Sequence, residues 1–426
     1  MPTRYDLLYL MSTPVLLPYL GWRRVARGKY TESARGMRGQ WLPAGEAARP
    51  FRNGSIWIHA VSVGEVTAAR AIAPGLRRLL PELPLVVSTV TETGQRTARE
   101  AFPDDHITYF PADLSRNVAR FQQTFQPRIF VLLETEIWPN FLTLAARRGT
   151  PCFMVNGKLS ERSFPRYRRF RGVLRPALDA LRGICTQTRL DAERFGALGI
   201  PPGRIRVTGN CKFDVAYPTL TEEERTGMMA EFGMDPGRVW IVAGSTHPGE
   251  ERVMLRALGE VRGSVPEAGL VLCPRHPERF EEVARQAAEA GWRVGRASRA
   301  GEVADPEVVV LDRMGVLART YGLGRVAVVA GSFGRVGGHN LLEAAAHGVP
   351  VVYGPAMHAQ REIVRLFEQA GAGVQVEPAG LGGELGRLMT DEAARQQEGD
   401  RSLRAVAASR GSADRALEAI AGWLNR

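Results

Sequence analysis

The chain has 426 residues, of which 44% are hydrophobic and 24% are charged. This composition supplies apolar material for two or three folded domains and excludes a disordered or collagen-like chain. Lys and Arg number 56 against 45 Asp and Glu, a net charge of +11, which favours anionic partners such as nucleic acid, phospholipid or phosphorylated substrates.

An uncharged run from Leu7 to Trp22 opens the chain, and four basic residues follow it closely. The run is shorter than the roughly 20 apolar residues of a membrane-spanning helix, and no signal-peptide cleavage site follows it. We therefore expect residues 1–28 to form a membrane-associating N-terminal helix whose basic end contacts anionic head groups. The alternative is a buried N-terminal helix that packs on the body of the protein.

After this segment, short β-branched runs alternate with amphipathic stretches. Continuous apolar strands separated by helices are typical of a parallel sheet in an α/β fold. The predicted strands of the first half are Ile56–Val61, Leu85–Val90, His106–Phe110, Arg128–Glu134, Cys152–Val155, Ile184–Gln187 and Ile205–Thr208. The helices predicted between them include Ala68–Leu80 and Leu190–Leu198.

The strand pattern restarts after a helical segment at Thr221–Phe232. The second set of predicted strands is Trp240–Gly244, Gly269–Cys273, Val308–Leu311, Val326–Ala330 and Val351–Tyr353. We therefore predict two Rossmann-like domains that face a central cleft, the first over residues 45–218 and the second over residues 222–408. Residues 409–426 are expected to form a C-terminal helix that packs back on the first domain.

The four cysteines are not arranged as C-x-x-C pairs, and each lies in or beside a strand-like run. We interpret them as buried, reduced thiols of a cytosolic protein rather than as a disulfide or zinc framework.

Polar residues follow most of the predicted strands. In open parallel sheets ligands bind outside the carboxyl ends of the strands, so these residues are the candidates for a site. The polar strings are HAVSVGE at 59–65, ETG at 92–94, DLS at 113–115, ETEIWPN at 134–140, NGKLS at 156–160 and GNCKFD at 209–214, then GSTH at 244–247, PRHPER at 274–279, GSFG at 331–334 and GGHN at 337–340.

Five strings together resemble the 3-deoxy-D-manno-octulosonic acid (Kdo) transferases of lipopolysaccharide biosynthesis, glycosyltransferase family 30. They are HAVSVGE (59–65), ETEIWPN (134–140), GNCKFD (209–214), PRHPERF (274–280) and GGHNLLE (337–343). The resemblance implies a GT-B fold and an enzyme that moves Kdo from CMP-Kdo to the 6'-hydroxyl of a lipid A precursor (lipid IVA). It also implies association with the cytoplasmic side of the cell inner membrane.

Inverting glycosyl transfer to an alcohol needs a base for the acceptor proton and charge stabilisation at the departing phosphate. The resemblance assigns the base to Glu65 and transition-state stabilisation to Glu134 and Lys212. Each residue also has a structural interpretation. Glu65 could complement a helix dipole, Glu134 could be an ion-pair partner at a strand end, and Lys212 could be a surface lysine.

The resemblance places CMP on the second domain. The implied nucleotide contacts are Pro274, Arg275, Met314, Gly315, Val316, Asn340, Leu341, Leu342 and Glu343. Val316 stands where the family usually has Glu, so its contact must come from the backbone or from packing. A helix that starts at Asn340 after a glycine-rich turn would offer N–H groups to a phosphate, although such glycines also occur in turns without a ligand.

A basic segment, Lys158–Arg175, carries aromatic residues between its basic ones. Because arginine pairs with phosphate bidentately, this segment is a candidate for binding lipid A phosphates or the membrane surface; the alternative is a solvated helix face. No D-x-D pair is present, and we expect neither a metal nor another cofactor.

Two other functions fit part of the sequence. Another GT-B nucleotide-sugar enzyme of the UDP-GlcNAc type would share the fold but lack the WPN and KFD strings. A nucleic-acid-binding protein would fit the basic charge, but no RRM, KH or helix-turn-helix signature is present, so we expect no nucleic-acid partner.

Overall fold

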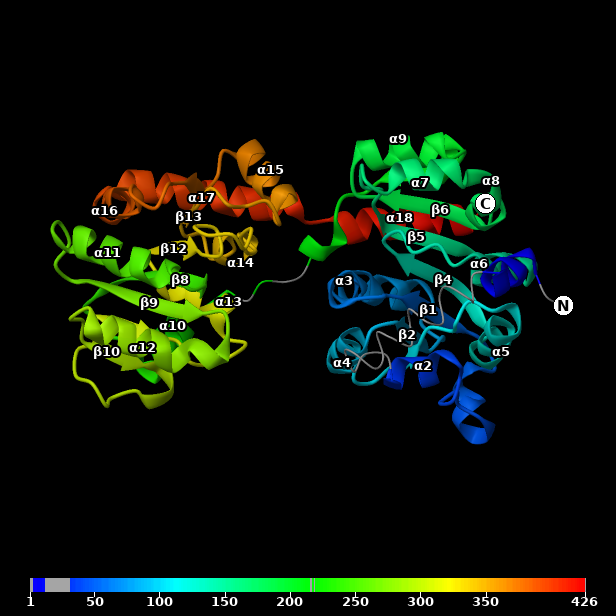
Figure 1. Cartoon of the computed structure of the whole chain (residues 1–426), viewed down its shortest axis with the longest axis horizontal. Helices are drawn as coiled ribbons and strands as arrows, with labels where there is room; N and C mark the ends of the chain where they lie inside the picture. The colour runs from blue at the N-terminus through cyan, green and yellow to red at the C-terminus, as the bar shows by residue number, and fades with distance from the viewer. Residues whose placement is uncertain (1–2, 12–30, 215–216, 218, 426) are drawn as a thin grey trace. The chain divides into compact units, whose positions relative to one another are not determined.

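A computed structural model describes residues 3–11, 31–214, 217 and 219–425. It divides the chain into two compact units, the first comprising Met1–Val215 with Arg410–Arg426 and the second Ala216–Ser409. Each unit is a parallel sheet covered by helices (Figure 1).

The first unit contains seven parallel strands in the order β3-β2-β1-β4-β5-β6-β7. The strands are β1 Ser55–His59, β2 Leu85–Thr89, β3 His106–Tyr109, β4 Pro127–Leu133, β5 Cys152–Gly157, β6 Leu181–Thr186 and β7 Ile205–Val207. Its helices are α2 Thr31–Met37, α3 Val63–Leu79, α4 Glu92–Ala101, α5 Ser115–Phe125, α6 Pro139–Arg147, α7 Phe164–Arg169, α8 Arg171–Asp179, α9 Arg189–Ala197 and α18 Ser412–Leu424, with 3₁₀ turns η1 Gly45–Phe51, η2 Pro202–Arg204 and η3 Cys211–Phe213.

The second unit repeats this plan with the order β10-β11-β9-β8-β12-β13-β14. The strands are β8 Val239–Thr246, β9 Ala268–Pro274, β10 Val294–Arg296, β11 Val308–Val310, β12 Val326–Val329, β13 Val351–Tyr353 and β14 Val374–Gln375. The helices are α10 Glu222–Glu231, α11 Glu250–Arg262, α12 Phe280–Glu289, α13 Leu317–Thr320, α14 Leu342–Ala345, α15 Arg361–Ala370, α16 Leu381–Thr390 and α17 Glu392–Ser409, with 3₁₀ turns η4 Pro277–Arg279, η5 Ala297–Arg299 and η6 Tyr321–Leu323.

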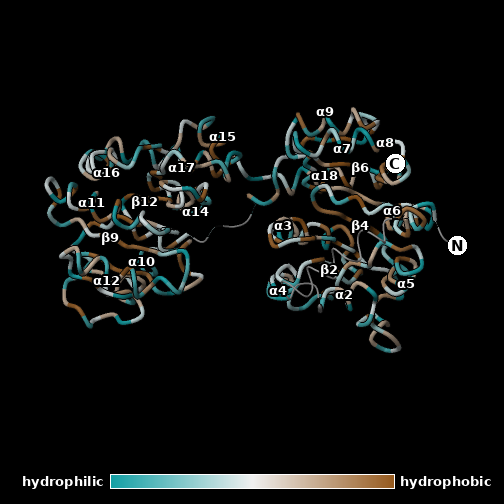
Figure 2. The backbone as a smooth tube through the Cα atoms, in the orientation of Figure 1, coloured by the Kyte–Doolittle hydropathy of each residue, from teal (hydrophilic) through white to brown (hydrophobic). Residues whose placement is uncertain are grey.

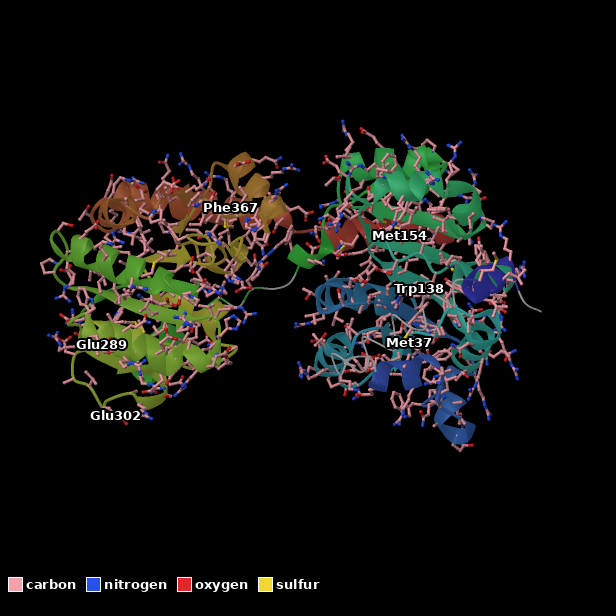
Figure 3. All side chains as sticks on the ribbon, viewed as in Figure 1. Met37, Trp138, Met154, Glu289, Glu302 and Phe367 are labelled. Carbon is pink, nitrogen blue, oxygen red and sulfur yellow. The ribbon has the colours of Figure 1, made fainter. Side chains whose placement is uncertain are left out.

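The sheets are buried on both faces, as their continuous apolar runs predict. On β1, Ile56 and Ile58 join one core cluster while Trp57 joins the cluster on the opposite face, and all three are fully buried. Strands such as β4 and β9 are correspondingly brown in Figure 2. Side chains follow the same separation of buried apolar and exposed charged residues. In Figure 3, Met154 lies inside the first unit, whereas Glu302 lies at the margin of the second.

The predicted strands are present with shifted ends, but the sequence missed β10 and β14. Each lies at an edge of its sheet. Their sequences, VGR and VQ, contain one apolar residue each, so neither shows the apolar run that marks the predicted strands. Helix α3 begins at Val63 rather than at the predicted Ala68. The polar first turn of α3 lacks the apolar period that marks the rest of the helix.

Helix α18 belongs to the first unit although it follows the whole second unit in sequence. Two glycines leave the space in which α18 packs. A Cβ on Gly75 of α3 would lie 1.9 Å from Leu417, and a Cβ on Gly183 of β6 would lie 2.1 Å from Trp423. The indole of Trp423 also donates a hydrogen bond to the carbonyl of Gly203 (3.1 Å).

At the N-terminus, residues 4–11 are helical and the remainder of the predicted anchor, residues 12–28, lies outside the described residues. The helical residues contact the first unit through Asp6, which accepts a hydrogen bond from the N–H of Ser115 (2.8 Å). Leu10 and Met11 are exposed. Within the described ranges, no helix combines the length and the apolar character needed to cross a bilayer. All four cysteines are buried and free.

Candidate active site

The strand order of the first sheet reverses between β1 and β4. From β1 the chain continues through β2 and β3 to one edge of the sheet, and from β4 it continues through β5, β6 and β7 to the other edge. Ligands of open α/β sheets bind beyond the strand ends at such a switch point. Glu65 follows β1 in the first turn of α3, and Glu134 follows β4 directly. The topology therefore brings two of the three predicted catalytic residues to the same edge of the sheet.

Glu65 is 5% exposed and its carboxylate is fixed at the start of α3. One oxygen accepts a hydrogen bond from the N–H of Val61 (2.8 Å) and the other from the hydroxyl of Ser62 (3.0 Å). Burial raises the pKa of Glu65 to about 7, and the charge of Glu134 adds to this rise against the opposing hydrogen bond from Val61. A carboxylate with a pKa near neutrality suits proton transfer at physiological pH.

Lys212 lies beside this carboxylate pair. Its ammonium group pairs with Glu134, and a Cβ added at Gly64 would lie 3.2 Å from the Lys212 Nζ atom. The lysine therefore passes over the first turn of α3, next to Glu65. The structure thus brings Glu65, Glu134 and Lys212 together, although they are separated by up to 147 positions in the chain, as 212 − 65 shows.

Backbone strain accompanies this arrangement. Glu134 at the end of β4 and Asn156 in β5 both have left-handed φ angles, 56° and 62°, a conformation that costs non-glycine residues roughly 1–3 kcal/mol and that clusters at functional sites. The buried side chain of Asn156 accepts the N–H of Cys211 (3.0 Å), and Asn210 accepts the N–H of Lys212 (3.1 Å). These contacts fix the turn that carries the lysine.

Other residues of the recognised strings have structural roles. His59 is fully buried and stacks on Phe110 with ring centroids 3.9 Å apart. Asn140 is fully buried, and its side chain donates to the carbonyl of Asp113 (2.6 Å). Arg279 pairs with the fully buried Glu251 (2.5 Å).

In the second unit, the predicted nucleotide residues gather around Glu343. The side chain of Asn340 donates to Glu343 (3.3 Å) and to the hydroxyl of Tyr217 (3.4 Å). Burial raises the pKa of Glu343, whereas Asn340 and the positive charge of Arg275 oppose this rise. Arg275 and Asn340 therefore share Glu343 as a neighbour. Pro274 is the last residue of β9, and the N–H of Arg275 donates to the carbonyl of Thr246 (3.0 Å).

The predicted start of the helix at Asn340 is wrong. Helix α14 begins at Leu342, not at Asn340, and has only four residues. The side chain of Asn340 already accepts the N–H of Leu342 (3.1 Å), so this N–H is engaged within the chain. Leu341 and Leu342 are fully buried, which leaves only their main-chain atoms for a ligand.

Met314, Gly315 and Val316 form the turn that precedes α13. Met314 is 58% exposed and Gly315 has a φ of 81°. No hydrogen bond or ion pair of the described residues joins this turn to Arg275 or Asn340 directly. Helix α13 is tied to the end of α14 instead, where the ring of His347 bonds the carbonyl of Ala318 (2.6 Å).

Two histidines complete the switch point of the second sheet, which lies between β8 and β12. The Nε2 atoms of His247 and His339 are 2.9 Å apart. The sequence places both residues after predicted strands but assigns them no ligand role. Sequence reasoning could not place these two histidines side by side, because the pairing of β8 with β12 is known only from the structure. Among the described residues, no three His, Cys, Asp or Glu side chains are grouped as metal ligands.

Residues 29–215 match the family model described as 3-deoxy-D-manno-octulosonic-acid transferase (kdotransferase). A 3-deoxy-D-manno-octulosonic acid transferase of Bordetella pertussis is 32% identical over 95% of this chain and 95% of its own length. The transferase of Haemophilus influenzae is 30% identical over 99% and 98%.

Solved structures share the architecture. A glycosyltransferase from Rickettsia africae superposes with a TM-score of 0.57 at 12% identity, over 87% of this chain and 99% of that one. UDP-GlcNAc 2-epimerase from Neisseria meningitidis gives 0.58 at 10% identity, over 86% and 100%. These matches confirm the predicted GT-B fold class. Given its similarity to curated relatives over nearly the whole length, the chain belongs to the Kdo transferases, glycosyltransferases that transfer Kdo.

Proposed function

We propose that this enzyme transfers Kdo from CMP-Kdo, with inversion, to the 6'-hydroxyl of a lipid A precursor such as lipid IVA. Glu65 acts as the general base. The observation that carries this proposal is the buried Glu65 carboxylate, with a pKa raised to about 7 and a neighbouring Lys212–Glu134 pair. No metal takes part.

In the proposed step, the acceptor hydroxyl oxygen attacks the anomeric carbon of Kdo as the bond to the CMP phosphate breaks. The hydroxyl proton passes to Glu65, and the bonding electrons leave with the phosphate. Lys212 offsets negative charge near the reacting centre, where a fixed cation is most effective in a water-poor site. Glu134 positions the lysine through their ion pair.

The donor nucleotide is proposed to bind the second unit at Pro274, Arg275, Asn340 and Glu343, with Met314, Gly315, Val316, Leu341 and Leu342 contributing backbone or packing contacts. Support comes from the grouping of Arg275 and Asn340 around Glu343. Glu343 can accept hydrogen bonds from ribose hydroxyls, and Arg275 can pair with the phosphate.

The acceptor is proposed to bind beside α7 and α8. Seven basic residues of this segment are exposed, namely Lys158, Arg162, Arg166, Arg168, Arg169, Arg171 and Arg175. Arg175 already pairs with Asp179 (2.8 Å). The hydroxyl of Tyr167 donates to the carbonyl of Thr135 (3.3 Å), next to Glu134, so the basic helix packs against the loop of the candidate site. We place this surface at the cytoplasmic side of the inner membrane.

The direct test is incubation with CMP-Kdo and tetraacylated lipid A precursor, with product masses read by mass spectrometry. We expect a product heavier by a whole number of Kdo residues, and none with Glu65→Gln, which retains CMP binding. Unchanged turnover of Glu65→Gln would remove Glu65 from the mechanism.

A second experiment addresses the acceptor surface. Replacing Arg166, Arg168 and Arg169 by Gln should raise the acceptor KM and leave the CMP-Kdo KM unchanged, because only the acceptor phosphates would lose their partners. An unchanged acceptor KM would contradict this placement.

A further inference from the structure

The imidazoles of His247 and His339 form a close pair at the switch point of the second sheet. His247 follows β8, and His339 lies in the segment that follows β12. Their ring planes are nearly parallel, at 5° with centroids 5.2 Å apart, and their Nε2 atoms face each other at 2.9 Å. Parallel sheets bind ligands at this position, yet the proposed nucleotide contacts do not include either ring.

The surrounding backbone holds this pair in place. The buried carboxylate of Glu250 accepts the N–H groups of His247 (2.9 Å), Gly331 (2.8 Å) and Phe333 (2.9 Å). A Cβ on Gly331 would lie 2.6 Å from the ring of His339. The glycine therefore lets that ring lie against the backbone, and Glu250 ties both segments together.

The contact between the two nitrogens limits the protons that the pair can hold. One Nε2 donates its hydrogen and the other accepts it, because two N–H groups would repel each other at this distance. Burial lowers the pKa of His339 to about 4, and the neighbours His247, Arg275 and His276 act in the same direction. Burial also lowers the pKa of His247, against the charges of Glu250 and Glu251.

The charged groups nearest to the pair are Arg275, Glu250 and Glu251. Arg275 and His276 follow β9 and are exposed. The two carboxylates are already engaged, since Glu250 accepts three N–H groups and Glu251 pairs with Arg279. An arriving oxyanion would therefore meet one guanidinium and two neutral imidazoles whose Nε2 atoms share a single hydrogen.

We propose that His247 and His339, together with Arg275, form the subsite for an oxyanion of the donor, and that the pair takes up one solvent proton when that anion binds. This inference rests on the proposed function, because the oxyanion is either the phosphate or the sugar carboxylate of CMP-Kdo. In the bound state the Nε2–Nε2 hydrogen bond is replaced by two N–H donors that point at anion oxygens. Such charge-assisted hydrogen bonds are shorter and stronger than neutral ones.

The test is isothermal titration calorimetry of the full chain at pH 7.5 in two buffers of different ionisation enthalpy. CMP binding should take up about one proton, because the free pair is neutral there and the bound pair is charged. Cytidine, which lacks the phosphate, should bind without uptake. Free Kdo as a third ligand distinguishes the carboxylate from the phosphate, since the ligand that takes up the proton identifies the anion.

The variant His339→Gln should abolish the uptake and weaken CMP binding roughly tenfold, without changing cytidine affinity. His247→Gln should show the same loss and serves as the second variant if His339→Gln does not fold. We expect it to fold, because the main-chain N–H of residue 247 still donates to Glu250. His358→Gln is the matched control, since it removes an exposed imidazole of the same unit and should keep the uptake.

Each outcome separates this inference from the function on which it rests. Three outcomes would overturn the inference but not the proposed function. They are CMP binding without proton uptake, proton uptake that persists in both His339→Gln and His247→Gln, and proton uptake that disappears in His358→Gln. If CMP fails to bind but inorganic phosphate binds with uptake that depends on His339, the CMP donor is wrong and the oxyanion subsite stands. If CMP, Kdo and phosphate all fail to bind, both the oxyanion subsite and the proposed CMP-Kdo donor are wrong.

Discussion

At the level of single residues, Glu65 has a structural role and is also the proposed general base. Its carboxylate accepts hydrogen bonds at the start of α3, as a helix-capping residue would, and uses two of its roughly four acceptor positions. The remaining positions are available for a proton. Burial and the nearby charge of Glu134 favour the protonated form, so the group is destabilised as an anion in the folded state.

The cost of burying the Glu65 carboxylate predicts how Glu65→Gln changes the free energy of unfolding. The pKa of Glu65 rises from 4.5 to about 7 on folding, so the folded state binds the proton more tightly and stability falls as the pH rises through this window. At pH 8 the neutral glutamine should therefore raise the free energy of unfolding by roughly 1–3 kcal/mol. Urea denaturation at pH 8 and pH 5 measures the difference.

The same variant should show little gain at pH 5, where wild-type Glu65 is protonated in the folded state. A gain of equal size at both pH values would contradict the pKa. In wild type, transfer activity should fall as the pH drops below about 7, because the base becomes protonated.

At the level of elements, the candidate site depends on how closely α3 approaches the turn that carries Lys212. Gly64 is the second residue of α3 and leaves room for the lysine, since a Cβ there would lie 3.2 Å from Nζ. Its φ angle is not in the left-handed region, so the backbone itself would accept alanine. The glycine therefore serves close packing rather than a turn.

We predict that Gly64→Ala leaves the protein at least as stable, since alanine favours the helix, but lowers kcat about three- to tenfold through displacement of Lys212. Gly196→Ala is the matched control, because Gly196 is also helical and has no atom within 4 Å of the added Cβ. Equal kcat values in the two variants would show that the lysine does not need this space.

The C-terminal helix provides a second prediction at this scale. Trp423 is 5% exposed, lies over Gly183 and stacks on Phe153 with centroids 6.1 Å apart. Trp423→Ala should lower the free energy of unfolding of the first unit by about 3–5 kcal/mol. Leu190→Ala, at a residue that is 50% exposed, should cost less than about 0.5 kcal/mol. A small loss for Trp423→Ala in urea denaturation would mean that α18 is not part of the first core.

At the scale of the whole molecule, the chain folds as two units with separate cores, and the candidate groups are divided between them. Glu65, Glu134 and Lys212 belong to the first unit, whereas Arg275 and Asn340 belong to the second. Because a ligand stabilises only the folded unit that binds it, the two units should respond differently to the nucleotide.

Differential scanning calorimetry tests this division. CMP at a hundredfold excess over its Kd should stabilise one transition by about 2.7 kcal/mol, or about 5–10 °C for a unit of this size. Arg275→Gln should reduce the shift, whereas Glu65→Gln should keep it. A CMP shift that is lost in Glu65→Gln and retained in Arg275→Gln would place the nucleotide on the first unit.

The α/β class, the order of most strands along the chain and the family could be predicted from the amino-acid sequence, because continuous apolar runs and the motifs at their ends are local features. Which motif residues lie exposed at a strand end and which are buried in the core follows from the tertiary structure. His59, Asn140 and Arg279 are buried among structural partners, and α14 begins at Leu342 rather than at the predicted Asn340. Strand order brought His247 to His339, and the packing of α18 joined the chain end to the first unit. Both depend on contacts between residues far apart in sequence, which no local pattern encodes.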